Sequence, residues 1–141
     1  KNRNIAVGMA SYLRIQEKIG NIEVGHIHYS FPMQKKPIGT EAMYLMMKRV
    51  FDELGYRRYE WKCDSLNERS CKAAKRFGFT FEGVFKQHNI VKGHNRDTAW
   101  FSIIDKDWDR IKKNYETWLD KTNFNKEGKQ NKSLTSLMLQ T

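Results

Sequence analysis

Two short groups of residues in this chain have the types and the spacing that are needed to bind a phosphate and to move a proton. The first group is the basic loop Gln34-Lys-Lys-Pro-Ile-Gly39, which follows an extended, half-apolar segment and precedes a strongly patterned helix. Such a loop binds anions because unpaired backbone N–H groups and the positive end of the helix dipole point at the ligand. The two lysines add mobile positive charge. An ordinary basic turn between a strand and a helix is the alternative.

The second group is Asn67-Glu-Arg-Ser70, which lies between a predicted strand and a short predicted helix. Asn67 is placed to cap that helix, and the same side chain can reach a ligand beside it. Ser70 is either a proton donor or a solvent-facing residue of the first helical turn. Titratable side chains on neighbouring predicted strands are candidates for a general base. Each also has a structural role as its alternative, and together they are Glu23, His26, His28, Glu60, Glu82 and His88.

The elements that position the basic loop are a strand before it and a helix after it. Alternating apolar residues predict a strand over residues 4–15, a turn at Lys18–Asn21 and an antiparallel strand over residues 22–29. Apolar residues at helical spacing predict a helix over Thr40–Leu54, with Thr40 as its N-cap. The methionines of this helix are expected to face the core rather than a ligand groove.

A further strand, over Arg58–Asp64, is predicted after this helix. A strand that connects to a neighbouring strand through a helix makes a crossover, so residues 58–64 and 22–29 are expected to be parallel neighbours. The basic loop, residues 34–40, then lies at the carboxyl end of its strand. Ligands of α/β sheets bind at that end.

The second half of the chain continues the alternation of helix and strand. The pattern predicts a helix over Glu68–Phe77, which Gly78 ends, and two strands over residues 79–85 and 98–104. The polar, glycine-containing segment Lys86–Asp97 is expected to join these two strands as a long hairpin. An amphipathic helix over Asp107–Leu119 follows, with its large apolar residues on one side.

Length and composition fit one folded domain. The chain has 141 residues, of which 39% are hydrophobic, which is enough to build a core. We expect the domain to span residues 1–120, and residues 121–141 to be a polar tail that is partly disordered or loosely docked. No run of about 18 apolar residues predicts a membrane span, and no signal-peptide pattern opens the chain. The chain begins with Lys1 rather than Met, which predicts a fragment or a processed product.

Cysteine content and charge narrow the class of protein further. The two cysteines, Cys63 and Cys71, do not have the spacing of metal ligands, so we expect a reduced, cytoplasmic protein without a metal. The net charge of +10 is scattered along the chain, and no nucleic-acid-binding motif accompanies it. A solvated basic surface is the simpler interpretation, so neither nucleic acid nor a membrane is an expected partner. No feature of the sequence predicts an oligomeric state.

In this order, with a strand and a helix between them, the two groups resemble the GNAT superfamily of acetyl-CoA-dependent N-acetyltransferases. Gln34-x-x-Pro37-x-Gly39 is similar to the pyrophosphate loop of that family. Asn67-x-x-Ser70, followed by Phe77-Gly-Phe79, is similar to its next characteristic element. The resemblance covers residues 5–108.

The resemblance implies an α/β fold with a mixed, mostly antiparallel sheet, one splayed pair of parallel strands, and helices on both faces. It also implies an N-terminal strand and two helices, for which no counterpart precedes Lys1. Residues 41–47 and 96–104 look closest to the branch that contains ribosomal-protein N-terminal acetyltransferases and their relatives.

The chemistry that the resemblance implies is transfer of an acetyl group from acetyl-CoA to a primary amine, either a protein N-terminus or a small amine. The amine attacks the thioester directly in a ternary complex, so Cys63 and Cys71 are expected to be packing residues rather than nucleophiles. Ser70 is implied as the acid that protonates the leaving thiolate, because Ala74 stands where many members carry a tyrosine. Glu60 and His88 are expected as candidates for the catalytic base.

The resemblance also implies how the cofactor is bound. The backbone amides after Gln34 bind the pyrophosphate, and a backbone N–H near the end of the preceding strand polarises the thioester carbonyl. Pro37 departs from the family pattern, because it stands where a glycine is usual and has no N–H to donate. The expected cofactor-binding residues are Ile27, His28, Tyr29, Gln34, Lys35, Lys36, Pro37, Ile38, Gly39, Thr40 and Asn67.

Two alternatives to an active acetyltransferase are also consistent with the sequence. A non-catalytic acyl-CoA-binding or partner-binding remnant of the same fold is suggested by Pro37, by Ala74 and by the N-terminal elements without a counterpart. A basic nucleic-acid-binding domain is suggested only by the net charge.

Overall fold

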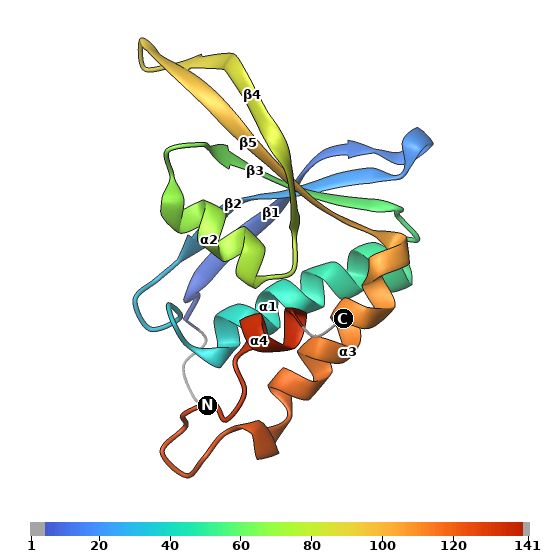
Figure 1. Ribbon diagram of the computed structural model, residues 1–141, viewed down its shortest axis with the longest axis vertical. Coiled ribbons are helices and arrows are strands. Elements are labelled where there is room, and N and C mark those ends of the chain that lie inside the picture. The colour runs from blue at the N-terminus through green and yellow to red at the C-terminus, as the bar shows by residue number, and fades with distance from the viewer. Residues whose placement is uncertain (1–4, 140–141) are drawn as a thin grey trace.

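The protein is a single twisted sheet with helices packed below it, as the ribbon of the computed structural model shows (Figure 1). The structure describes residues 5–139. The sheet has five strands in the order β1-β2-β3-β5-β4. Their bounds are Gly8–Gln16 for β1, Asn21–Tyr29 for β2, Arg58–Asp64 for β3, Thr80–Val91 for β4 and His94–Ile104 for β5.

The direction of the strands confirms the predicted mixed sheet. Among the described strands, β2 and β3 run parallel, and every other neighbouring pair runs antiparallel. A short 3₁₀ turn, Glu17–Ile19, joins β1 to β2, and Gly20 follows it with a φ of 66°. The first strand, predicted over residues 4–15, begins at Gly8, and residue 4 lies outside the described part of the chain.

Helix α1 (Pro37–Lys48) begins three residues before the predicted start at Thr40. Pro37 occupies its first turn, where the missing N–H of proline is not needed and its fixed φ suits the helix. The predicted N-cap is therefore wrong. Lys36 is the residue before the helix, and Thr40 lies buried inside it. The helix continues as a π-helical turn over Arg49–Glu53.

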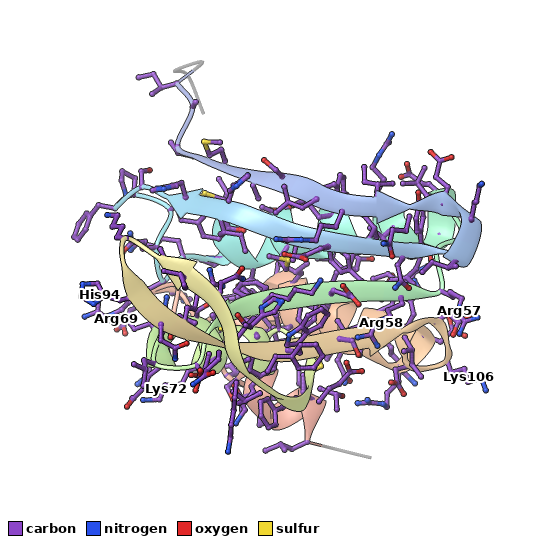
Figure 2. All side chains as sticks on the ribbon, turned by 90° about the horizontal axis from the view of Figure 1, so that it is seen from above. Arg57, Arg58, Arg69, Lys72, His94 and Lys106 are labelled. Carbon is purple, nitrogen blue, oxygen red and sulfur yellow. The ribbon has the colours of Figure 1, made fainter. Side chains whose placement is uncertain are left out.

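The remaining helices all pack on the same face of the sheet as α1, and Figures 1 and 2 both show the strands on one side and the helices on the other. The structure differs here from the expected fold, which had helices on both faces. Two right-handed crossovers that step in the same direction along a sheet place their helices on the same side. The bounds are Glu68–Arg76 for α2, Asp105–Leu119 for α3 and Leu134–Met138 for α4.

Aromatic residues hold the helices to this face. Phe51 meets Tyr59 of β3 edge-on with 6.3 Å between ring centroids, and Trp108 of α3 stacks on Phe51 at 5.1 Å. Phe77, directly after α2, packs on Trp61 of β3 at 6.1 Å. The predicted apolar side of α3 is confirmed, since its four large residues are buried: Trp108, Ile111, Tyr115 and Trp118.

The segment after α3 is more ordered than the expected polar tail. Leu134 and Leu137 of α4 are buried in the same hydrophobic cluster as the sheet residues. Asn123 is also buried, and its side chain donates hydrogen bonds to the carbonyl oxygens of Trp118 and Lys132. The core therefore continues past residue 120, and the last residues of the expected tail, 140–141, lie outside the described part.

The connection between β4 and β5 is a long hairpin, as predicted for the polar segment 86–97. The two strands extend into this segment and remain paired up to Val91 and His94. The turn between them is Lys92-Gly93, and both residues have positive φ values, 52° and 78°. Two such residues suit the tight turn of a β-hairpin, so polar residues continue the strands. None of the helices in residues 5–139 is long and apolar enough to cross a lipid bilayer.

Candidate functional site

The two parallel strands separate part-way along their length. Pairs of residues from β2 and β3 follow each other from Asn21–Arg58 to Val24–Trp61, and the pairing ends there. Beyond this point the second half of β2, residues 25–29, and the end of β3, residues 62–64, line a cleft of about 900 Å³. This confirms the expected splayed pair. The β2 backbone that faces β3 is no longer used by the sheet and can pair with an extended ligand.

A β-bulge in β2 lies where the separation begins. Met9 pairs with His28 and Ser11 with Gly25, so two residues of β2 stand opposite one residue of β1. His26, in the bulge, has a φ of 48°, and a left-handed residue in a bulge bends its strand. Gly25 is needed beside it, because a Cβ there would lie 2.4 Å from a methyl carbon of Leu13. The bulge and the glycine together turn β2 away from β3.

The basic loop after β2 is tied to the strand end. Gln34, expected to contact the cofactor, uses its side-chain amide to donate a 2.7 Å hydrogen bond to the carbonyl oxygen of Tyr29. Lys35 adopts a φ of 56°, and the N–H of Lys36 donates back to Met33 at 3.4 Å. Because Pro37 sits in the first turn of α1, it removes no helical hydrogen bond. Pro37 thus fits the helix, although it still has no N–H to offer to an anion.

Gly39 keeps the start of α1 close to the strand. A Cβ at this position would lie 3.2 Å from the carbonyl oxygen of Met33 and 3.3 Å from the ring of Tyr29. The N–H of Gly39 donates to Lys36 at 3.2 Å, so this amide is already used within the loop. Ile38 beside it is exposed. The loop therefore presents a helix N-terminus and two exposed lysine side chains to an anion.

A second cavity, of about 570 Å³, adjoins the loop on the side of α2 and α3. Arg76 at the end of α2 lines it and donates a 3.1 Å hydrogen bond from Nη1 to the hydroxyl of Thr40. Burial lowers the pKa of Arg76, and its guanidinium lies 5.4 Å from the ring centre of Trp118. Sequence reasoning missed Arg76, because only the packing of α2 beside α1 reveals that its charge lies next to the loop.

Asn67 and Ser70 both line the large cleft, as expected. The side-chain oxygen of Asn67 accepts a 3.0 Å hydrogen bond from the N–H of Ser70, which makes Asn67 the N-cap of α2. The hydroxyl of Ser70 accepts a 3.0 Å hydrogen bond from the indole N–H of Trp61. This contact uses an acceptor position of Ser70 and not its hydroxyl hydrogen, which can donate to the neighbouring sulfur of Cys63 or to a ligand in the cleft.

The cysteines behave as packing residues. Cys63 is buried, and its sulfur lies 3.5 Å from that of Cys71. Burial raises the pKa of Cys63 to about 11, so its thiol stays protonated at neutral pH and is a poor nucleophile. The described residues contain no group of three or more histidine, cysteine or acidic side chains that is placed to bind a metal ion.

Glu60, a candidate base, is buried in a network of charges on the open face of the sheet and does not line the cleft. Its carboxylate oxygens form ion pairs with Nε of Arg58 at 2.6 Å and with Nζ of Lys62 at 2.7 Å. Burial alone would raise the pKa of Glu60, but the hydrogen bonds from Lys62 and Arg58 outweigh it and lower the pKa. Lys62 also contacts Glu23 at 2.9 Å, so the carboxylates of Glu23 and Glu60 share one ammonium group.

His88, the other candidate base, also lies away from the cleft lining. It stands on β4, where its Nδ1 is 2.9 Å from the hydroxyl of Thr98 and its ring is 6.0 Å from that of Trp100. Glu82 on the same strand is held by Arg58 and by the hydroxyl of Ser102 at 2.6 Å. Of the histidines considered from the sequence, those that line the cleft are His26 and His28.

The structure also places in the cleft three basic residues that sequence reasoning did not select, Lys62, Arg69 and Arg96. Lys62 lies over the ring of Trp100, 3.9 Å from its centre. The Nε of Arg96 is buried and has no hydrogen-bond partner among the described residues. Arg96 lies in the segment that was expected to be a long hairpin, and no motif in the sequence assigned it to the site.

Comparison with known proteins identifies the family. Residues 1–80 match the family described as the acetyltransferase (GNAT) domain, which is more than half of the chain. The chain belongs to the GNAT acetyltransferase family. The splayed strands, the loop before α1 and the start of α2 all lie within the matched residues of this GNAT protein, and the predicted superfamily is confirmed. No curated protein sequence matches the chain.

Solved structures support the same family. A GCN5-related N-acetyltransferase from Brucella melitensis is 48% identical, with a TM-score of 0.92, and covers 94% of this GNAT chain and 60% of its own. A probable GNAT acetyltransferase from Chromobacterium violaceum is 45% identical with a TM-score of 0.74, covering 77% of this chain and 55% of its own. The chain thus spans about three-fifths of the length of these relatives.

A more distant structure shows the fold alone. The spermidine N-acetyltransferase from Vibrio cholerae, in a mutant form, has a TM-score of 0.64 and is 16% identical to this chain. It covers 72% of the chain and 60% of its own length. At this identity the likeness extends to the arrangement of strands and helices and not to the acceptor.

Proposed function

We propose that this protein is an acetyl-CoA-dependent N-acetyltransferase that transfers an acetyl group to a primary amine. The observation that carries the proposal is the end of pairing between β2 and β3 at Val24–Trp61, directly before a basic loop and a helix N-terminus. An extended thioester cofactor with a pyrophosphate needs both features, because one half of it pairs with backbone and the other half is an anion.

The residues at each end fit acetyl-CoA in this proposal. Backbone amides within Lys35–Thr40 and the lysines of the loop bind the pyrophosphate, while Gln34 holds the loop to Tyr29. Arg76 and the cavity beside it add positive charge next to the nucleotide end. The opened backbone of residues 27–29 lies along the other half of the cofactor, where one N–H polarises the thioester carbonyl.

Proton transfer is assigned to the groups that the cleft contains. The amine nitrogen attacks the thioester carbon, the carbon–sulfur bond breaks, and the thiolate receives the hydrogen of the Ser70 hydroxyl, which Trp61 holds in place. Ser70 regains a hydrogen from water, which makes up for the proton that the amine releases. The amine loses its proton to water or to His28, both of which can reach the cleft. Glu60 and His88, the bases expected from the sequence, have no part in this scheme, because neither lines the cleft.

A resemblance of two segments bears on the finer identity of the acceptor. Residues 41–47 and 96–104 resemble the branch of ribosomal-protein N-terminal acetyltransferases, which favours a protein N-terminus over a small amine. The alternative function is a non-catalytic acyl-CoA-binding or partner-binding remnant of the fold, which Pro37, Ala74 and the N-terminal elements without a counterpart suggest. Ala74 is fully buried and does not line the cleft.

Calorimetric titration of the chain with acetyl-CoA tests the proposal. We expect saturable binding with a dissociation constant of about 10 µM, and weaker binding of acetyl-pantetheine, which lacks the pyrophosphate. No heat of binding at millimolar acetyl-CoA would refute it. Release of free CoA in the presence of peptide amines separates the two functions, since a non-catalytic domain binds acetyl-CoA and releases no thiol.

A further inference from the structure

Most of the charged side chains that line the large cleft are positive. Permanently positive side chains of its lining are Lys35, Lys62, Arg69 and Arg96, and Asp64 is the carboxylate among its described lining residues. Asp64 is occupied locally, because its Oδ1 accepts a 2.9 Å hydrogen bond from the N–H of Leu66. A cleft with this lining attracts anions and repels cations.

Arg96 differs from the other positive residues of this lining because one of its donors is buried and has no hydrogen-bond partner among the described residues. Lys62 is paired with Glu23 and Glu60 at 2.9 and 2.7 Å. No ion pair of the described residues includes Arg96, and its buried Nε has no hydrogen-bond partner. A buried donor without a partner costs about 1–3 kcal/mol, so it is typical of a site that a ligand completes.

The position of Arg96 separates it from the loop that the cofactor pyrophosphate would use. Arg96 stands on β5, two residues after His94, and Figure 2 shows His94 at the same end of the molecule as Arg69 at the start of α2. Burial raises the pKa of Cys63 to about 11, and the charge of Arg96 acts against this, so Arg96 lies within electrostatic range of that thiol. The N–H of Ser65 donates to the carbonyl oxygen of Asp97 at 2.9 Å, so Arg96 lies beside the end of β3, and it lines the same cleft as Cys63 and Ser70.

We propose that the acceptor is an amine that carries a carboxylate a few atoms from the reacting nitrogen, and that Arg96 binds this carboxylate. The inference rests on the proposed function and specifies its acceptor class. A guanidinium matches a carboxylate because two parallel N–H groups meet its two oxygens. A peptide with an acidic side chain next to its N-terminus has this chemistry. A polyamine, the acceptor in the name of the distant spermidine enzyme, does not.

Paired acceptors test this inference. The C-terminally amidated peptides Ala-Glu-Ala and Ala-Gln-Ala have the same N-terminal amine and nearly the same size, and spermidine supplies the opposite charge. We expect kcat/KM for the glutamate peptide to exceed that for the glutamine peptide by about tenfold, and spermidine to be the poorest acceptor. If the chain does not turn over, equilibrium binding of the two peptides to its CoA complex gives the same ratio.

The variant Arg96→Gln should bring the ratio of the two peptides to about one. Arg57→Gln is the matched control, because Arg57 is exposed, and Figure 2 shows it at the opposite end of the molecule from Arg69. It should keep the tenfold preference. Thermal unfolding and acetyl-CoA binding should be the same in both variants, which separates loss of preference from loss of folding.

The outcomes distinguish this inference from the proposed function. Absence of acetyl-CoA binding would overturn both. Acetyl-CoA binding with equal use of the two peptides, or with spermidine preferred, would overturn the acceptor class alone. A preference for the glutamate peptide that survives in Arg96→Gln would overturn the role of Arg96.

Discussion

The two halves of the β2–β3 pair differ although they belong to the same strands. In the first half, residues 21–24 pair with residues 58–61 and lie at the centre of the sheet. In the second half the strands part, and the bulge at His26 stands where the parting begins. The first half buries apolar side chains such as Ile22 and Val24, whereas the second half exposes His26 and His28. Where the pairing with β3 ends, the backbone of β2 is thus free to form hydrogen bonds with a ligand.

The paired half holds the centre of the sheet together, whereas the opened half lines the cleft where we propose that acetyl-CoA binds. Charged groups on the open face lock the paired half, since Glu60 binds both Arg58 and Lys62. The opened half has Gly25 and a left-handed histidine instead. Predictions can therefore be made separately for the two halves, by closing the opened half or by loosening the paired half.

The largest effect is expected from placing a negative charge where the opened half meets α1. Gly39→Asp puts a carboxylate at the helix N-terminus, where the proposed pyrophosphate lies and where Met33 and Tyr29 leave little space. We expect acetyl-CoA binding to weaken by about a hundredfold because two anions then compete for one helix N-terminus. Calorimetric titration measures this change.

Gly39→Asn is the control for that variant, because asparagine has the same size without the charge. It should weaken binding less than Gly39→Asp, by a factor of about ten. Equal losses in the two variants would mean that the space at Gly39, and not charge, limits binding. Retained affinity in Gly39→Asp would contradict a pyrophosphate site at this position.

A smaller effect is expected from the bulge. His26→Val places a β-branched residue at a φ of 48°, which such residues avoid, and should lower the free energy of unfolding by about 1–2 kcal/mol. His26→Gly accepts this φ and should keep stability close to that of the unaltered chain. Urea unfolding compares the three proteins. Equal stability for valine and glycine would show that the bulge is not held at this residue.

The smallest effect is expected on the stability of the protein at acid pH. The hydrogen bonds from Arg58 lower the pKa of Glu82, and the pKa of Glu60 is lowered because Lys62 and Arg58 outweigh its burial. A carboxylate with a lowered folded-state pKa stabilises the protein above its unfolded value, about 4.3, and this contribution is lost as the pH falls through the folded value. Unfolding at decreasing pH should therefore show stability falling below about pH 4.

Glu82→Gln tests the share of Glu82 in this acid response. Its side chain is 38% exposed, so solvent screens the pair and the contribution is only about 0.5 kcal/mol. Urea unfolding at neutral and acid pH should show a smaller loss on acidification for the variant than for the unaltered chain. The same loss in both would place the acid-sensitive groups elsewhere.

Much of the fold was predictable because the spacing of apolar residues and the turn residues between elements are local features of the sequence. The alternation over Arg58–Asp64 and the helical spacing of Trp108 to Trp118 gave elements with nearly the observed bounds. The parallel pair followed from the crossover rule. The start of α1 was missed because Thr40 looks like a cap, whereas Pro37 had already begun the helix.

The site was less predictable, because its members depend on partners far away in the sequence. Asn67 and Ser70 were found since their motif is local, and both line the cleft. Glu60 looked free in the sequence, but Arg58 and Lys62 hold its carboxylate. Arg96 was missed because it belongs to no motif, and only the place of its hairpin in the sheet shows that it lines the cleft.

Amide NMR spectra during titration with acetyl-CoA test the central claim most directly, because they report both halves of the β2–β3 pair in one experiment. The account predicts large, saturable shifts at residues 27–29 and 35–40, and small ones at the paired residues 22–24. Saturable shifts centred on the paired residues or on the β1–β2 turn, or no saturable shifts at all, would contradict it.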